Sequence, residues 1–118
     1  MLTERTQVTV TIASGGSDST AINCSGGSVK RIHVPASTQG ASIILLHSPT
    51  TSGTFASAQH PGGWLRAIPL NTVPCAIELP PEDYAGSNSV KIRTCSDQFG
   101  AVAQSQSADR TFTVVVVE

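Results

Sequence analysis

The chain has 118 residues, of which 39% are hydrophobic and 13% charged, and its seven basic and eight acidic side chains give a formal net charge of −1. This length fits a single domain with one hydrophobic core. The basic residues are scattered rather than clustered, so the electrostatic footprint of a nucleic-acid-binding protein is missing. No apolar stretch is long enough to cross a membrane.

The first predicted strand covers residues 7–12, where Val8, Val10 and Ile12 alternate with polar residues and face inward. Further short strands are bounded by glycine, proline, serine or asparagine. Their predicted ranges are 20–23, 29–34, 41–47, 75–79 and 89–94. Within the third range, the run from Ile43 to Leu46 predicts a strand that is buried on both faces.

The middle of the chain carries the weakest pattern. Residues 48–63 are rich in serine, threonine, proline and glycine, which indicates a hairpin or a long loop with a short strand at 54–56. Another short strand is predicted at 64–68. Residues 81–86 predict a single helical turn, with proline at its start and glycine at its end. Residues 98–107 predict a loop or an irregular strand.

The chain closes with a charged turn followed by a strand of β-branched residues. Phe112, Val114 and Val116 share one face of this strand, and Val115 and Val117 lie on the other. Apolar residues on both faces place the strand centrally in two layers of β-structure or place one face against another chain. At the start of the strand, Asp109 and Arg110 form either a charge-assisted pair or a solvated turn.

These patterns predict the fold class. Short strands at roughly regular spacing, with turns between them and no long helix, are typical of an all-β protein. We expect a single-domain β-sandwich of jelly-roll type with about eight short strands. The sandwich domain is predicted to cover residues 7–118, and residues 1–6 are predicted to form an N-terminal arm.

The cysteines indicate a reducing compartment. Cys24, Cys75 and Cys95 are far apart, and the first six residues lack the apolar region of a secretion signal. An odd cysteine count without such a signal predicts buried, reduced thiols rather than a disulfide framework. A bridge between Cys75 and Cys95, formed after cell lysis, is the alternative. We expect the protein to be made in a cytoplasm.

Residue types that carry out chemistry occur without the spacing of a catalytic or metal site. His33, His47 and His60 do not form a metal-binding motif, and no cysteine lies close to a histidine in the sequence. No serine stands in a Gly-x-Ser-x-Gly motif. The adjacent Glu82 and Asp83 are typical of a turn start rather than of paired acid catalysis. The sequence therefore predicts no enzyme, cofactor or metal site.

The only tryptophan, Trp64, follows a glycine pair at the end of the loop-rich residues 48–63. One interpretation is a core residue. The other is an anchor for a partner protein, because tryptophan is enriched at the energetic centres of interfaces.

Four segments together resemble a group of small β-sandwich virion proteins of tailed bacteriophages. Some members of this group look like capsid decoration, or cement, proteins. The similarity covers about residues 7–117, and this chain departs from the pattern at residues 48–55, where relatives tend to have an Asp-Gly hairpin followed by an aromatic residue. The segments are Gly26-Gly27 with the strand that ends at Pro35-Ala36, the turn Leu79-Pro80-Pro81-Glu82-Asp83-Tyr84-Ala85-Gly86, the strand Val90-Lys91-Ile92-Arg93, and the final Ala108-Asp109-Arg110-Thr111-Phe112-Thr113-Val114.

The resemblance implies a structural function in the virion. We expect a homotrimer that binds the major capsid protein. Its site is expected on the outer surface of the expanded shell, at capsomer junctions, where binding stabilises the shell. The alternative is a binding module associated with a tail, a spike base or a fibre. We expect the arm to lie on the shell and the outer face of the last strand to pack between subunits. The predicted interface residues are Leu2, Thr3, Arg5, Trp64, Val115 and Val117.

Overall fold

The computed structural model describes residues 5–24, 27–48, 54–57, 63, 66–79 and 89–117. These residues form nine β-strands, so the predicted all-β class is confirmed with about one strand more than expected. In chain order the strands are β1 (Arg5–Ile12), β2 (Ile22–Asn23), β3 (Ser28–Val34), β4 (Ser42–Ser48), β5 (Ala56–Ser57), β6 (Ile68–Pro69), β7 (Cys75–Glu78), β8 (Ser89–Cys95) and β9 (Arg110–Val117).

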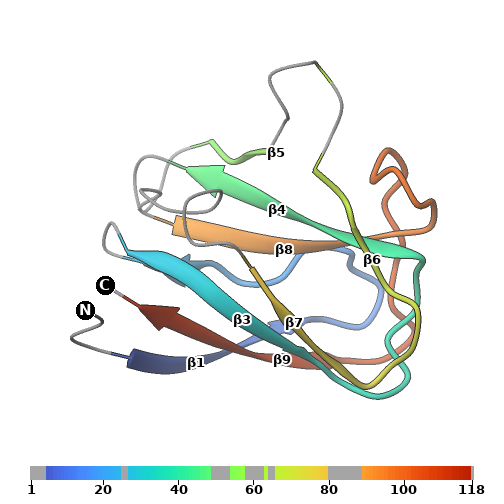
Figure 1. Cartoon of the computed structure of the whole chain (residues 1–118). Helices are drawn as coiled ribbons and strands as arrows, with labels where there is room; N and C mark the ends of the chain where they lie inside the picture. Colours follow the sequence, from blue (N-terminus) through green and yellow to red (C-terminus); the bar gives the residue numbers. More distant parts are fainter. Residues whose placement is uncertain are drawn as a thin grey trace.

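The strands form two antiparallel sheets that pack face to face (Figure 1). Sheet I has the order β1-β9-β3-β7, and sheet II has the order β2-β8-β4-β5, with β6 also paired to β4. Early strands pair with late ones, β1 with β9, β2 with β8, β3 with β7 and β4 with β5, as in a long hairpin rolled across two layers. This is the strand order of a jelly roll, as predicted.

Sheet I places the N-terminal and C-terminal strands side by side (Figure 1). β1 pairs with β9 along its whole length, from Arg5 opposite Val117 to Ile12 opposite Arg110. The inward residues of β1 and β9 are packed into the core, as their alternation predicts. Since β1 begins at Arg5, the last two residues of the predicted arm belong to sheet I.

Strand β4 is buried on both faces, as the sequence predicts. Its inward residues, Ile43 and Leu45, belong to the main core between the sheets. Its outward residues belong to a second, smaller cluster on the outer side of sheet II. This second cluster consists of Ile44, Leu46 and Cys95, with Phe55 and Ala67 packed against it.

A buried glutamine fixes the loop that precedes β9. The Gln106 Oε1 atom accepts hydrogen bonds from the backbone N–H of Gln39, at 2.9 Å, and from Nε of Arg110, at 3.2 Å. Its Nε2 atom donates to the Gln39 carbonyl, at 2.7 Å, and to Thr94 Oγ1, at 2.9 Å. One side chain therefore joins the β3–β4 turn, strand β8 and the start of β9.

The start of β9 lacks the predicted charge-assisted pair, and residues 107–109 form an exposed bend, in line with the alternative of a solvated turn. The Asp109 carboxylate accepts a hydrogen bond from the backbone N–H of Ser14, at 2.8 Å, and no ion pair with Arg110 is found in the described residues. Arg110 instead donates to Gln106 and to the Ser107 hydroxyl. The predicted helical turn at residues 81–86 lies outside the described residues.

The three cysteines are not joined by a disulfide, and two of them are buried as the sequence predicts. Cys24 and Cys95 are buried, and Cys75 is half-buried. Burial raises the pKa of the Cys24 thiol from 9.0 to about 11, because the apolar surroundings disfavour the thiolate. Burial also raises the pKa values of Cys75 and Cys95.

The Cys24 thiol predicts a loss of stability at alkaline pH. Above pH 9.0 the unfolded chain releases the Cys24 proton, whereas the folded chain retains it up to about pH 11, so unfolding is favoured as pH rises. Because one pH unit corresponds to about 1.4 kcal/mol, this thiol lowers the free energy of unfolding by roughly 2–3 kcal/mol across that interval. Urea unfolding of wild type and Cys24→Ala at several pH values measures this. If the free energy of unfolding depends on pH equally in the two proteins, the raised pKa of the Cys24 thiol is contradicted.

Candidate interaction surface

The sequence-predicted interface residues have different positions in the structure. Leu2, Thr3 and Trp64 lie outside the described residues. Arg5 is the first residue of β1, and its backbone lies opposite Val117 of β9. The structure therefore places Arg5 opposite Val117, where β1 begins and β9 ends, with Val115 two residues away on β9 (Figure 1).

The outer face of β9 is already covered within one chain. Val115 and Val117 are 5% and 3% exposed, although they lie on the face of β9 that points away from the main core. The apolar character of this face is thus accounted for without a second subunit. It provides no separate evidence for a contact between chains.

The loop between β8 and β9 carries the exposed apolar surface. Phe99 is 76% exposed and Val102 is 56% exposed, and they are the large hydrophobic side chains that the described residues leave open to solvent. This loop extends from one end of the sandwich (Figure 1). We call Phe99 and Val102, together with the backbone that holds them, the Phe99 loop.

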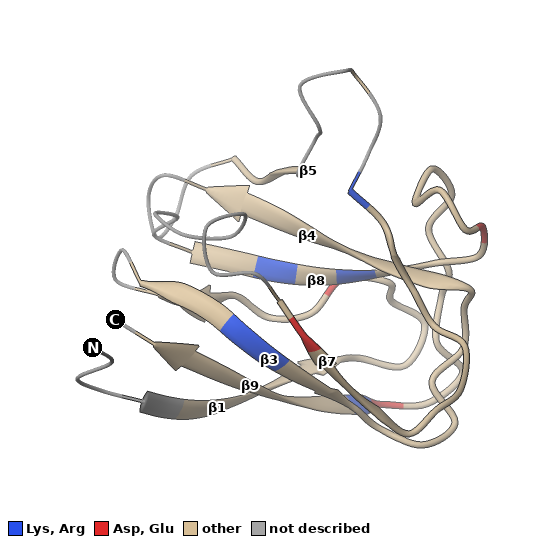
Figure 2. Ribbon diagram, in the orientation of Figure 1, with Lys and Arg blue, Asp and Glu red and all other residues tan. Residues whose placement is uncertain are grey.

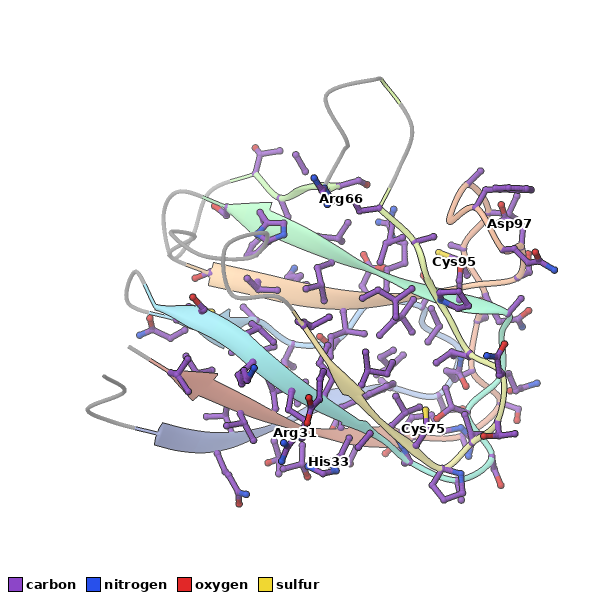
Figure 3. All side chains as sticks on the ribbon, in the orientation of Figure 1. Arg31, His33, Arg66, Cys75, Cys95 and Asp97 are labelled. Carbon is purple, nitrogen blue, oxygen red and sulfur yellow. The ribbon has the colours of Figure 1, made fainter. Side chains whose placement is uncertain are left out.

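An aspartate organises the Phe99 loop from within. The Asp97 carboxylate accepts hydrogen bonds from the backbone N–H groups of Val102, Ala101 and Phe99, at 2.9, 3.1 and 3.3 Å. These bonds, first from Val102 and then from Ala101, hold the pKa of Asp97 below its ordinary value. The Ser42 hydroxyl donates to the Asp97 carbonyl at 2.7 Å, which joins the loop to β4. Figure 3 labels Asp97 in this loop.

A glycine lets the Phe99 loop approach sheet II closely. Gly100 has φ = +77°, a left-handed conformation that residues with a Cβ rarely adopt. A Cβ added there would lie 2.5 Å from Cγ2 of Ile44 and 3.4 Å from Cβ of Ala67. The loop backbone therefore packs directly on the small apolar cluster, and Phe99 projects from a fixed base.

This arrangement is suited to binding another protein. A loop that is already ordered loses little conformational entropy on association, so more of the contact energy remains as affinity. An exposed aromatic residue can fill a pocket on a partner, which is how the strongest residues of many interfaces act. The Phe99 loop is the part of the described chain where both conditions meet.

Strand β8 carries basic residues (Figure 2), and two of them contact other segments of the chain. The Lys91 ammonium lies 4.6 Å from the centre of the Phe55 ring. Arg93 donates from Nε and Nη2 to the two carboxylate oxygens of Asp18, at 2.6 and 2.9 Å. The hydrogen bond from Arg93 lowers the pKa of Asp18. These contacts hold the N-terminal turn and the β5 segment against β8.

The outer face of sheet I carries polar side chains on β3 and β7, beside the buried valines of β9. Nη2 of Arg31 donates to Glu78 Oε1 at 2.7 Å, and this bond lowers the pKa of Glu78. His33 is exposed, on the outer side of the sheet near Arg31, as its place in the strand predicts (Figure 3). An exposed ion pair of this kind contributes little to stability.

Potential metal ligands and catalytic groups are dispersed. The described residues hold no group of three or more histidine, cysteine, aspartate or glutamate side chains that could bind a metal ion. His33 lies on β3 and His47 on β4, in opposite sheets, and His60 lies outside the described residues. Nor do those residues contain a helix with the length and apolar character needed to cross a membrane.

Sequence reasoning did not identify the Phe99 loop. Residues 98–107 were predicted as a loop or irregular strand, without a functional role. A usable signal is present in the spacing, because an aspartate that precedes a glycine in a loop often bonds to the backbone that follows it. A lone phenylalanine in that context indicates an aromatic residue outside the core.

Comparison with known proteins gives no relative from which a function could be transferred. No protein-family model matches the chain, and neither a curated protein nor a solved structure matches it.

Proposed function

We propose that this chain is a structural virion protein of a tailed bacteriophage, which decorates the outer surface of the expanded capsid. The jelly roll alone does not assign this role, since the same fold serves capsid proteins, lectins and cupins. The proposal joins the sequence resemblance to one observation, the exposure of Phe99 and Val102 on a fixed loop. In this proposal, the Phe99 loop inserts into an apolar pocket of the major capsid protein.

The composition supports attachment to another protein surface. The chain has few charges, with seven basic and eight acidic residues that nearly cancel. Interface cores are depleted in charge, so a weakly charged domain loses little solvation energy when it is covered. The charged contacts Arg93–Asp18 and Arg31–Glu78 are satisfied within the chain.

The mechanism is stabilisation by binding. Each bound copy buries apolar surface worth about 25 cal/mol per Å², and this energy opposes separation of the capsomers. A protein that binds the expanded shell but not its precursor adds after maturation and stabilises the mature state by mass action. Neither a cofactor nor a covalent step is required.

The first test compares binding of Phe99→Ala and wild type to empty expanded shells. Since an interface anchor contributes about 2 kcal/mol or more, the Kd of Phe99→Ala is expected to rise about 30-fold or more. Gln98→Ala serves as the matched control, because it removes an exposed polar side chain from the same loop. Its Kd is expected to stay within about 3-fold of wild type.

Two results would contradict the proposal. Equal binding by Phe99→Ala and wild type would remove the Phe99 loop from the contact. A failure of wild type to bind expanded shells at all would remove the decoration function. Because Phe99 is exposed, the thermal unfolding midpoints of the variants should match that of wild type, which excludes misfolding as the cause of lost binding.

A further inference from the structure

Strand β1 differs from the other strands at the sheet edges. The edge strands of sheet II are β2 and β5, which have two residues each. One edge strand of sheet I is β7, which has four residues. The other edge of sheet I is β1, with eight residues. Its sequence RTQVTVTI contains no proline and only one charge, at its first position. Proteins normally protect long edge strands of this kind by charge, proline, a bulge or a covering segment.

The direction of the free backbone groups of β1 follows from its hydrogen bonds. The Thr11 carbonyl accepts a hydrogen bond from the Thr20 N–H, at 3.2 Å, and therefore points away from β9. Along a regular antiparallel strand the direction alternates with each residue, so the N–H and C=O groups of Arg5, Gln7 and Thr9 also point outward. In the described part of the chain, no residue hydrogen-bonds to the outward groups of Gln7 and Thr9.

We propose that β1 pairs with β1 of a second copy of this chain, antiparallel about a two-fold axis that passes beside Gln7. In this register Gln7 lies opposite Gln7 of the second copy, and Arg5 lies opposite Thr9. All three residues present outward groups, so three pairs form, each exchanging two N–H···O bonds. The two copies of sheet I become one continuous sheet, with the same surface used by both chains.

The side chains of β1 suit this register. The only charge on the strand, at Arg5, lies opposite the uncharged Thr9, so no like charges meet. Gln7 and Thr9 are exposed on the outer face, and the Gln7 amides of the two chains can hydrogen-bond to each other. On the inner face, Val8 is only half-buried although it packs against the core. A second β1 strand would complete its burial.

This inference does not depend on the proposed function. It predicts a dimer whether or not the chain binds a capsid, and it differs from the homotrimer that the sequence resemblance implies. Edge pairing of this length covers less surface than a standard interface of roughly 1,600 Å². We therefore expect a reversible dimer whose population increases with protein concentration.

The test uses two single substitutions, each of which adds one negative charge to the same face of β1. Gln7→Glu brings two carboxylates together at the two-fold axis, and the dimer Kd is expected to rise about two- to five-fold. Thr9→Glu places each new carboxylate opposite Arg5 of the other chain. Two such pairs form in each dimer, so the Kd is expected to fall about two- to thirty-fold.

Sedimentation equilibrium of the full chain and amide hydrogen exchange give the readouts. The expected species has twice the 12.2 kDa chain mass. Exchange of the outward amides of Gln7 and Thr9 should slow as concentration rises, while those of Val8 and Val10, which bond to β9, stay protected throughout. A chain that remains monomeric at every concentration overturns the proposal. So does an oligomer, trimeric or dimeric, whose affinity the two glutamate substitutions change in the same direction or not at all.

Discussion

Phe112→Ala is expected to lower the free energy of unfolding by about 3–5 kcal/mol. Among the residues that the structure describes, Phe112 is the largest fully buried side chain, and it packs into the main core from the centre of sheet I. The substitution removes most of that buried surface and leaves a cavity that the surrounding β-branched residues cannot fill. A loss of this size is a large part of the stability of a domain of this length.

Phe99→Ala is the matched control, because it makes the same chemical change at a residue that is mostly exposed. Its free energy of unfolding is expected to stay within about 0.5 kcal/mol of wild type. Urea unfolding of the three proteins gives both values. A large loss of stability in Phe99→Ala would contradict the exposure of Phe99. A small loss in Phe112→Ala would contradict the burial of Phe112.

Gln106→Leu is expected to lower the free energy of unfolding by about 2–4 kcal/mol. The leucine side chain has a similar size but forms no hydrogen bonds, so it leaves the N–H and C=O of Gln39 and the hydroxyl of Thr94 without this partner. An unsatisfied polar group that is buried costs about 1–3 kcal/mol, and the two Gln39 backbone groups lose their bonds together, whereas the Thr94 hydroxyl keeps its bond to the Gln104 carbonyl. Arg110 loses its bond to Gln106 as well.

Gln104→Leu is the control for this prediction. Gln104 lies two residues away in the same loop, and its Nε2 atom donates only to the adjacent Ser105 carbonyl, at 2.9 Å. Its replacement is expected to cost less than about 1 kcal/mol. If the two leucine substitutions have equal effects in thermal unfolding, the Gln106 network does not make the contribution assigned to it.

The fold could be predicted from local patterns. Alternation in β1 and β9 specified which residues face the core, and the unbroken apolar run of β4 specified a strand covered on both sides. What covers the outer face of β4 could not be predicted, since Phe55, Ala67 and Gly100 come from three separate segments. Periodicity describes one strand at a time and contains no information on such packing.

The candidate site was less accessible to sequence reasoning for the same reason. Gln106 appears in the sequence as one polar loop residue among several, and its main partner, Gln39, is 67 residues away. Phe99 gives only a weak signal, an aspartate and a glycine close by in a loop, and the closure of that loop on Ile44 shows that Phe99 points outward. Val115 and Val117 show the opposite case, where an apolar outer face suggested a subunit contact but is buried within one chain.

The central claim, that this chain decorates a capsid, is tested most directly by its copy number in the particle. Quantitative peptide mass spectrometry of purified virions would give the ratio of this chain to the major capsid protein. A ratio near one, or a sizeable fraction of one, is predicted, because a decoration protein occupies sites repeated over the whole shell. A few copies per particle would contradict the claim and would assign the chain to a tail, spike base or fibre.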